Sequence, residues 1–369
     1  MVARDNAVVR VNLGERSYDI EIGADAAGQA GEWARNRFRA THAFVITDAN
    51  VAELFGRPVL ESLRTAGLRA DWHVLPAGET EKTPARVYEC WQALVAARAD
   101  RKTLVVAVGG GVIGDLAGFV AATFTRGLRF LQVPTTLLAH VDSSVGGKVG
   151  VNLPDAKNMV GSFWQPAGVL IDTRTLETLP EREYRAGLAE VVKYGVILDP
   201  DFFELLEGSV ELLRSRDPQL LQQVIARCCR LKADVVEKDE REETGLRAVL
   251  NYGHTFCHAI ETATGYGRYL HGEAVSIGMV CASRLAERMG RIPAALTQRQ
   301  RQLLAALHLP VQVPAIDPQQ LVAAMQLDKK VEHGRLRFVL PTRMGHVELV
   351  GGVDERLVVD VLREESAAN

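Results

Sequence analysis

A glycine-rich turn between an apolar run and a helical pattern is the feature that most restricts the fold of this chain. The stretch VVAVGGGVIGDLAGFVAA has glycines at positions 109, 111 and 114. This spacing lets main-chain amides approach a pyrophosphate, whose charge is favoured by the N-terminus of the following helix. The stretch therefore predicts a strand, a turn and a helix of an α/β fold with a dinucleotide at the turn. A turn with a purely structural role is the alternative.

The carboxylate that usually accompanies such a turn is missing. A Rossmann domain has an Asp or Glu about 20 residues further on that binds the ribose, but no acidic residue occurs between Leu116 and Val141. Asp48, at the end of the apolar run HAFVITD, could bind the ribose in a chain of different topology. Thr135 and Thr136 follow another predicted strand and are either helix caps or ligand contacts. We therefore expect a dinucleotide site of non-Rossmann order.

The order of the predicted elements changes near residue 180. Before it, short apolar runs alternate with helical patterns, which is typical of a parallel sheet covered by helices. After it, helical patterns dominate, and a β-like run occurs only in RLRFVLPTRMGHVELV. We expect an α/β N-terminal domain with a parallel sheet over residues 1–180 and a mostly α-helical domain over residues 181–369.

The composition is that of a globular protein without an obvious polyanionic partner. Hydrophobic residues make up 47% and charged residues 24%, and the formal net charge is −3, so neither nucleic acid nor a membrane is expected as a partner. The five cysteines form no CxxC pair, which indicates a reducing compartment. The N-terminus has no apolar signal core, and no apolar run reaches the length of a membrane span. We expect a cytoplasmic enzyme or binding protein.

The stretch VDSSVGGKVGVN surrounds Lys148 with small residues. A Walker A motif would need a glycine where Asp142 stands and a Ser or Thr where Val149 stands, so we expect no γ-phosphate site. The stretch is either a solvated surface turn or a loop that contacts an anion. The second alternative is favoured by Lys157 and Asn158, which follow shortly after.

The helical half contains a possible charge pair and a group of histidines. Glu190 and Lys193 lie three apart between apolar residues, so they form either a surface ion pair or a buried pair that binds a ligand or metal. His254, His258 and His271 occur within eighteen residues, and imidazoles with a carboxylate suit Zn²⁺. Their spacing alone favours His254 and His258 as two ligands, and core or capping histidines are the alternative. Cys257 is expected on another helix face, as a small core residue.

Five motifs of this chain occur together in an order that resembles the 3-dehydroquinate synthase family: GGGVIGDLAGF, PTTLLAHVDSSVGGKVGVN, AKNMVGSFWQP, AGLAEVVKYG, and LNYGHTFCHAIE with HGEAV. The resemblance implies an NAD-binding α/β domain, a helical metal-binding domain, catalytic NAD⁺, a Zn²⁺ or Co²⁺ ion and a homodimer. It implies Glu190, His254 and His271 as the metal ligands. His258 is implied to face the substrate and not the metal.

The resemblance also implies two sets of contacts. The NAD⁺ contacts would be Asp48, Gly78, Glu79, Lys82, Gly111, Val112, Ile113, Gly114, Asp115, Thr135, Thr136, Lys148, Lys157, Thr175, Leu176, Glu177 and Thr178. The substrate contacts would be Arg126, Asp142, Lys148, Asn158, Lys193, Lys232, Arg247, Asn251, His258 and Lys330 or its neighbour Lys329. The catalytic residues among them would be Lys148, Lys193, Arg247, Asn251 and His258. Many family members have Asp before the glycine at position 78, where this chain has Ala77, so only a backbone contact is expected there.

The implied reaction converts 3-deoxy-D-arabino-heptulosonate 7-phosphate into 3-dehydroquinate and phosphate, a lyase step of the shikimate pathway. It combines a transient NAD-dependent oxidation, β-elimination, re-reduction and an intramolecular aldol step. Three alternatives stay open: another sugar phosphate cyclase such as a 2-deoxy-scyllo-inosose synthase, a metal-dependent polyol dehydrogenase, and a nucleotide-binding regulator without chemistry. His258 favours dehydroquinate synthase over the other cyclases, and the Glu and His set argues against the regulator.

Overall fold

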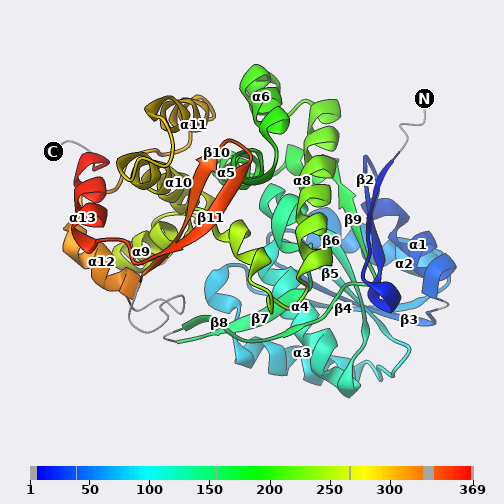
Figure 1. Cartoon of the computed structure of the whole chain (residues 1–369). Helices are drawn as coiled ribbons and strands as arrows, with labels where there is room; N and C mark the ends of the chain where they lie inside the picture. The colour runs from blue at the N-terminus through cyan, green and yellow to red at the C-terminus, as the bar shows by residue number, and fades with distance from the viewer. Residues whose placement is uncertain (1–5, 39, 155, 266, 327–335, 367–369) are drawn as a thin grey trace. The chain divides into compact units, whose positions relative to one another are not determined.

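The chain folds as two compact units in a computed structural model (Figure 1). The first unit comprises Met1–Leu179 and Pro218–Glu237, and the second comprises Pro180–Asp217 and Lys238–Asn369. An α/β unit with a parallel sheet is thus followed by a mainly helical unit, and the predicted fold class is confirmed. The structure describes residues 6–38, 40–154, 156–265, 267–326 and 336–366.

A seven-stranded sheet forms the centre of the first unit. Its strands are β1 (Ala7–Val11), β2 (Tyr18–Gly23), β3 (His42–Asp48), β4 (Arg69–Leu75), β5 (Leu104–Gly109), β6 (Arg129–Pro134) and β9 (Gly168–Asp172). They lie in the order β1-β2-β9-β6-β5-β3-β4, with β1 antiparallel to β2 and the other neighbours parallel. The carboxyl ends of the parallel strands therefore share one edge, at which the glycine turn follows β5.

Both faces of this sheet are covered by helices. The helices of the first unit are α1 (Ala30–Phe38), α2 (Arg57–Thr65), α3 (Pro84–Ala96), α4 (Gly111–Thr123) and α8 (Pro218–Lys238). Val45 and Val106 belong to a core with α1 and α2, whereas Phe44 and Val105 belong to a second core with α3 and α4. Because both faces are buried, β3 and β5 read as continuous apolar runs in the sequence.

Helix α8 belongs to the first unit although it occurs late in the chain. The Gln222 side chain donates to the carbonyl of Ile22 in β2 (3.0 Å), and the Cys229 thiol donates to the carbonyl of His140 (3.3 Å). This helix brings Lys232, a predicted substrate contact, into the first unit.

Part of the predicted loop around Lys148 is a β-hairpin. Strand β7 (Lys148–Leu153) pairs antiparallel with β8 (Ala156–Phe163), and Lys148 lies opposite Phe163. The many glycines and serines suggested a loop because they have low strand propensity. The hydrogen bonds to β8 outweigh that local preference.

Helices make up most of the second unit. They are α5 (Glu181–Leu198), α6 (Pro200–Gly208), α7 (Val210–Arg214), α9 (His254–Thr264), α10 (His271–Arg288), α11 (Ala294–Ala306), α12 (Pro318–Gln326) and α13 (Glu355–Glu364), with one antiparallel hairpin of β10 (Arg337–Arg343) and β11 (His346–Gly351). The mostly buried helix α10 packs against α5, α9 and α11. In the described part of the chain, no helix combines the length and the apolar character that a membrane crossing needs.

Candidate active site

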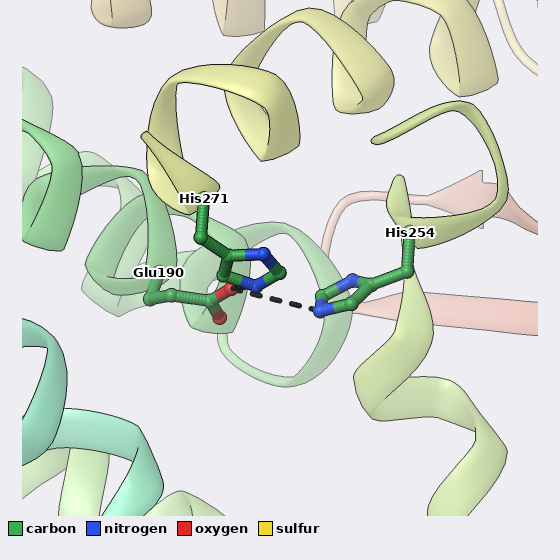
Figure 2. Close-up of side chains that lie close together, drawn as sticks. All are labelled: Glu190, His254 and His271. Carbon is green, nitrogen blue, oxygen red and sulfur yellow. Dashed lines mark ion pairs between the residues drawn. The ribbon is translucent and has the colours of Figure 1, made fainter. Parts of the chain in front are cut away.

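Three side chains from three helices of the second unit converge on one point (Figure 2). Glu190 comes from α5, His254 begins α9 and His271 begins α10. Oε1 of Glu190 lies 3.8 Å from Nε2 of His254 and 3.9 Å from Nε2 of His271. Ligand atoms around a tetrahedral zinc ion are about 3.4 Å apart, given bonds of about 2.0–2.2 Å. A small inward movement would therefore bring the three donors to metal-binding distances.

Two glycines allow the three helices to come this close. A Cβ atom on Gly272, next to His271, would lie 1.8 Å from the carbonyl oxygen of Ala186 in α5. Gly253, next to His254, has φ +79°, and a Cβ atom there would lie 2.8 Å from the backbone nitrogen of Met279 in α10. Only glycine fits either position without a backbone shift, so these two residues fix where the two histidines start their helices.

Glu190 and Lys193 form the buried pair that was one alternative from the sequence. Each is 1% exposed, and the Lys193 ammonium pairs with Oε2 of Glu190. The other carboxylate oxygen, Oε1, faces the two imidazoles. A buried carboxylate is costly unless positive charge surrounds it. Lys193 supplies one such charge, and a metal ion between the imidazoles would supply another.

The donor set fits a zinc or cobalt ion. Nδ1 of His254 donates to the carbonyl of Tyr252 at 3.1 Å, which leaves the lone pair on Nε2 for a metal. Burial lowers the pKa of His271, but Cys257 and Glu261 more than offset this and the net shift is upward. One carboxylate and two imidazoles leave a fourth position for a substrate oxygen.

His258 lies outside the metal-capable clusters found among the described residues. Its ring centroid is 5.8 Å from that of His254, and the two rings are nearly perpendicular at 86°. The spacing argument that paired these two histidines as ligands is not supported. Residues four apart share a helix face, but in this unit the remaining donors come from α5 and α10 instead.

A second group, Cys257, Glu261 and His271, adjoins the first. Cys257 is buried, as expected for a core residue, but it lies beside the His271 ring, with Sγ 3.7 Å from Nδ1. Sequence reasoning missed Glu261, which is only 7% exposed. Its position could have been found from spacing, because it follows His254 by seven residues, two helical turns, on one helical face.

The glycine turn of the first unit has the predicted strand and helix around it. β5 ends at Gly109, α4 begins at Gly111, and no side chain caps the helix at Gly110. The N–H of Thr135 donates to the carbonyl of Gly109 (3.0 Å), while its buried Oγ1 has no hydrogen-bond partner among the described residues. An uncapped helix N-terminus beside an unsatisfied hydroxyl fits the phosphates of a dinucleotide. Thr136 instead acts as a local cap, because its Oγ1 accepts from the N–H of Ala139 at 3.2 Å.

Lys82 connects several predicted contacts of the first unit. It is buried, and its ammonium donates to Asp115 at the start of α4 and to Asn158 of β8 (2.7 Å). Asn152 of β7 donates to Glu79 at 2.8 Å. Burial raises the pKa of Asp115, and the Lys82 ammonium offsets part of that rise. The turn that carries Gly78, which has φ +118°, is thereby held to the hairpin and to α4.

Two other predicted cofactor segments also lie in the first unit. Asp48 is half-buried at the end of β3; burial raises its pKa, while the N–H groups of Asn50 and Val51 oppose the rise. In the segment from 175 to 178, Thr175 and Leu176 are buried and the next two residues, Glu177 and Thr178, are exposed. The hydroxyl of Thr175 already donates to the carbonyl of Asp172 at 2.8 Å.

Asp142 and Lys232 form an ion pair within the first unit. The ammonium of Lys232 donates to Oδ1 (2.8 Å) and to the backbone carbonyl (2.6 Å) of Asp142. Lys232 is 5% exposed, whereas Lys148 is exposed and Lys157 is half-buried. Among the predicted substrate contacts of this unit, the Lys232 ammonium is therefore buried and held by Asp142, whereas solvent reaches Lys148.

The predicted contacts Arg247 and Asn251 share a short 3-10 helix, η8 (Leu246–Asn251). Arg247 is buried; its N–H donates to Asp239 (3.0 Å) and its guanidinium donates to the carbonyl of Glu240 (2.8 Å). Asn251 is half-buried. Both side chains therefore sit on a well-anchored segment.

The remaining predicted substrate contacts are either exposed or outside the described residues. Arg126 is exposed in a turn and has φ +69°, which is uncommon for a side chain of its size. Lys329 and Lys330 lie outside the described residues. Their contact with the substrate, like that of the other predicted contact residues, stays a prediction.

His140 is a buried histidine that sequence reasoning did not single out. It is 0% exposed, lies two residues before Asp142, and its Nε2 donates to the carbonyl of Pro134 at 3.0 Å. Burial lowers its pKa to about 4. The ring is therefore neutral in the folded protein at physiological pH.

We expect the first unit to lose stability on acidification through His140. Since the folded pKa lies below the unfolded one, this contribution is complete above the unfolded pKa and is lost as the pH falls toward the folded pKa. Between pH 7 and pH 5, the wild type should lose about 2 kcal/mol more than a His140→Gln variant. Urea titrations followed by tryptophan fluorescence measure this, because all four tryptophans lie in the first unit. Parallel pH profiles of the two proteins would contradict it.

The fold is that of the sugar phosphate cyclases. A 2-deoxy-scyllo-inosose synthase complexed with carbaglucose-6-phosphate, NAD⁺ and Co²⁺ has a TM-score of 0.89 and 29% identity, covering 97% of this chain and 100% of that one. The 2-epi-5-epi-valiolone synthase of Streptomyces hygroscopicus subsp. jinggangensis, with NAD⁺ and Zn²⁺ bound, has a TM-score of 0.87 and 30% identity, covering 96% and 98%.

Sequence comparison defines the family more narrowly. The family models described as 3-dehydroquinate synthase N-terminal and 3-dehydroquinate synthase C-terminal match residues 72–186 and 187–331. The 3-dehydroquinate synthase of Rhodopirellula baltica is 50% identical over 358 residues, which cover 95% of each chain. The chain belongs to the 3-dehydroquinate synthase family, and the resemblance seen in its motifs is confirmed.

Proposed function

We propose that this chain converts 3-deoxy-D-arabino-heptulosonate 7-phosphate into 3-dehydroquinate and phosphate, as a phosphate-eliminating lyase of the shikimate pathway. The observation that carries the proposal is the convergence of Glu190, His254 and His271 in a chain that is 50% identical to a 3-dehydroquinate synthase. A carboxylate with two imidazoles is the donor set that a catalytic zinc site needs.

A metal ion and NAD⁺ belong to the proposal. Glu190, His254 and His271 would hold a Zn²⁺ or Co²⁺ ion, and the glycine turn would hold NAD⁺; the two related cyclase structures contain NAD⁺ with Co²⁺ or with Zn²⁺. When bound, these groups supply a reversible hydride acceptor and a Lewis acid for the sugar oxygen that is oxidised.

The first unit would bind the cofactor through backbone and side-chain groups. The amides at the start of α4 would face the pyrophosphate, the hydroxyl of Thr135 would donate to it, and Asp48 would accept from the ribose. Lys82 supports this arrangement because it fixes Asp115 beside the turn. We assign further NAD⁺ contacts to Gly78, Glu79, Val112, Ile113, Thr136, Lys148, Lys157 and the segment from Thr175 to Thr178.

The substrate carries a phosphate and a carboxylate, whereas the net charge of the protein is −3. Its binding therefore requires local cations that are held in place. Lys232 meets this requirement because Asp142 orients it, and Arg247 because Asp239 and Glu240 anchor its backbone and side chain. We assign the remaining substrate contacts to Arg126, Lys148, Asn158, Lys193, Asn251, His258 and Lys330.

We assign proton transfer around the oxidised oxygen to His258. It stands next to His254 and outside the metal-capable clusters found among the described residues, and an imidazole beside a metal centre can relay protons. The departing phosphate serves as the base for the elimination. Lys193, beside Glu190, would stabilise negative charge that develops on the substrate.

Three wider properties belong to the same proposal. We assign cofactor binding to the first unit and metal binding to the second unit. The active form would be a homodimer, as the family resemblance implies. The enzyme would work in the cytoplasm, where its five free cysteine thiols stay reduced.

The proposed function predicts many turnovers for each NAD⁺. Zinc-loaded protein with the heptulosonate phosphate and a trace of NAD⁺ should release phosphate far in excess of the cofactor, without lasting NADH absorbance. A phosphate assay and NADH absorbance, recorded on the same sample, measure both quantities. Steady accumulation of NADH would instead indicate a polyol dehydrogenase.

Another sugar phosphate cyclase activity is the second candidate. The TM-score of 0.89 to a 2-deoxy-scyllo-inosose synthase supports it. The same assay with a hexose 6-phosphate decides between the two. Phosphate release from the hexose 6-phosphate alone would move the assignment to this second activity.

A further inference from the structure

The imidazole of His271 lies between two acidic side chains. Its Nε2 faces Oε1 of Glu190 at 3.9 Å, and its Nδ1 faces Oε1 of Glu261 at 3.5 Å. Glu190 comes from α5 and Glu261 from α9, so the ring at the start of α10 is in contact with both neighbouring helices. Which nitrogen of this ring can bind a metal depends on where the other one donates its proton.

His254 shows how the second nitrogen is used in this site. Its Nδ1 donates to the backbone carbonyl of Tyr252 at 3.1 Å, which directs the Nε2 lone pair toward Glu190. His271 needs an equivalent acceptor on its Nδ1 side if its Nε2 is to bind the same ion. Two candidates stand there: the carboxylate of Glu261 and the thiol of Cys257, whose Sγ is 3.7 Å from Nδ1.

Glu261 is the better acceptor of the two. A carboxylate oxygen accepts strongly, whereas sulfur accepts weakly. The Cys257 thiol also has its own acceptor, the carbonyl oxygen of His271 at 3.8 Å. Glu261 is 7% exposed, so water competes little for its charge. A small rotation of either side chain closes the 3.5 Å gap to an ordinary hydrogen bond.

We propose that Glu261 is a positioning residue that accepts the Nδ1–H of His271 and thereby directs the Nε2 lone pair of His271 at the metal. The proposal rests on the metal site of the proposed function and adds a fourth side chain on which that site depends. Outer-shell partners of this kind change metal affinity by about 10–100-fold when they are replaced.

The same three side chains allow one other interpretation, a second metal ion bound by Cys257, Glu261 and His271. His271 would then bridge two ions. The number of ions bound by each chain separates the two interpretations, because a positioning carboxylate leaves the wild type with one ion.

The test measures zinc and cobalt binding to metal-free protein by titration calorimetry, with Co²⁺ absorption as a second readout. We expect one ion for each chain throughout, about tenfold weaker binding for Glu261→Gln, and about a hundredfold weaker binding for Glu261→Ala, with altered Co²⁺ spectra. Gln keeps the size of Glu and can still accept a hydrogen bond, so it tests the proposal even if the Ala variant folds poorly.

Two matched variants complete the design. Cys257→Ala should bind zinc about as tightly as the parent protein, because Glu261 remains. Glu207→Gln removes the same charge from another ion pair of the second unit, with Arg299 (2.6 Å), and should leave affinity and spectrum unchanged.

Unchanged affinity and spectrum in both Glu261 variants would overturn the proposal, and so would two ions in the wild type with one in Glu261→Ala. Because binding is measured without turnover, a failure of the proposed reaction would not be mistaken for either outcome.

Discussion

Replacing His254 with alanine should give a folded protein that has lost tight zinc binding and nearly all turnover. His254 supplies one of three protein donors, and its Nε2 lies 3.8 Å from the carboxylate that would share the ion. Lewis-acid stabilisation contributes several kcal/mol to a transition state, so activity should fall about a thousandfold or more. Titration calorimetry with Zn²⁺ and a phosphate-release assay measure the two losses.

A histidine of the same unit provides the control. His346 is exposed on β11 and contacts Thr342 at 2.8 Å, so His346→Ala should bind zinc and turn over like the parent protein. A His254→Ala variant that keeps both its zinc and its activity would show that the cluster in Figure 2 is not the metal site.

The parts of the fold that sequence predicted well are those in which local pattern and tertiary environment agree. Strands β3 and β5 read as unbroken apolar runs because helices cover both sheet faces. The strand, glycine turn and helix at 104–123 follow one another in the chain, so their order was visible in the sequence. The β7–β8 hairpin was not visible, because its hydrogen bonds join segments whose glycines and serines favour a loop.

In the candidate site, too, local sequence pattern predicted some features, and others depend on contacts between helices. Glu190 and Lys193 lie on one helix face, and their burial could be inferred from their apolar neighbours. Spacing identified the right helix for His254 but not its partners, since His271 reaches Glu190 only through the close packing of Gly272 on α5. Spacing within α9 could have placed Glu261 on the face of His254, but it could not show that His271 of α10 lies against that face.

Replacing Lys193 with methionine should destabilise the metal-free protein by about 3–5 kcal/mol, because the Glu190 carboxylate then stays buried without its ammonium partner. Zinc should stabilise this variant more than it stabilises the parent protein, since the ion supplies the positive charge that the substitution removed. Calorimetric unfolding with and without zinc measures both effects. Lys238→Met makes the same substitution at an exposed position, the last residue of α8, and should change stability by less than about 0.5 kcal/mol.

A double-mutant cycle separates the ion pair from the other contacts of Lys193. In the metal-free state, Glu190→Gln combined with Lys193→Met should be more stable than Lys193→Met alone, because the uncompensated charge is gone. Zinc should no longer stabilise the double variant appreciably, since one of its ligands is lost. If Lys193→Met costs the same stability whether residue 190 is Glu or Gln, the ammonium does not compensate the carboxylate. The burial of both side chains would then require another explanation, such as the cation–π contact of the ammonium with the Tyr194 ring, whose centroid lies 5.5 Å away.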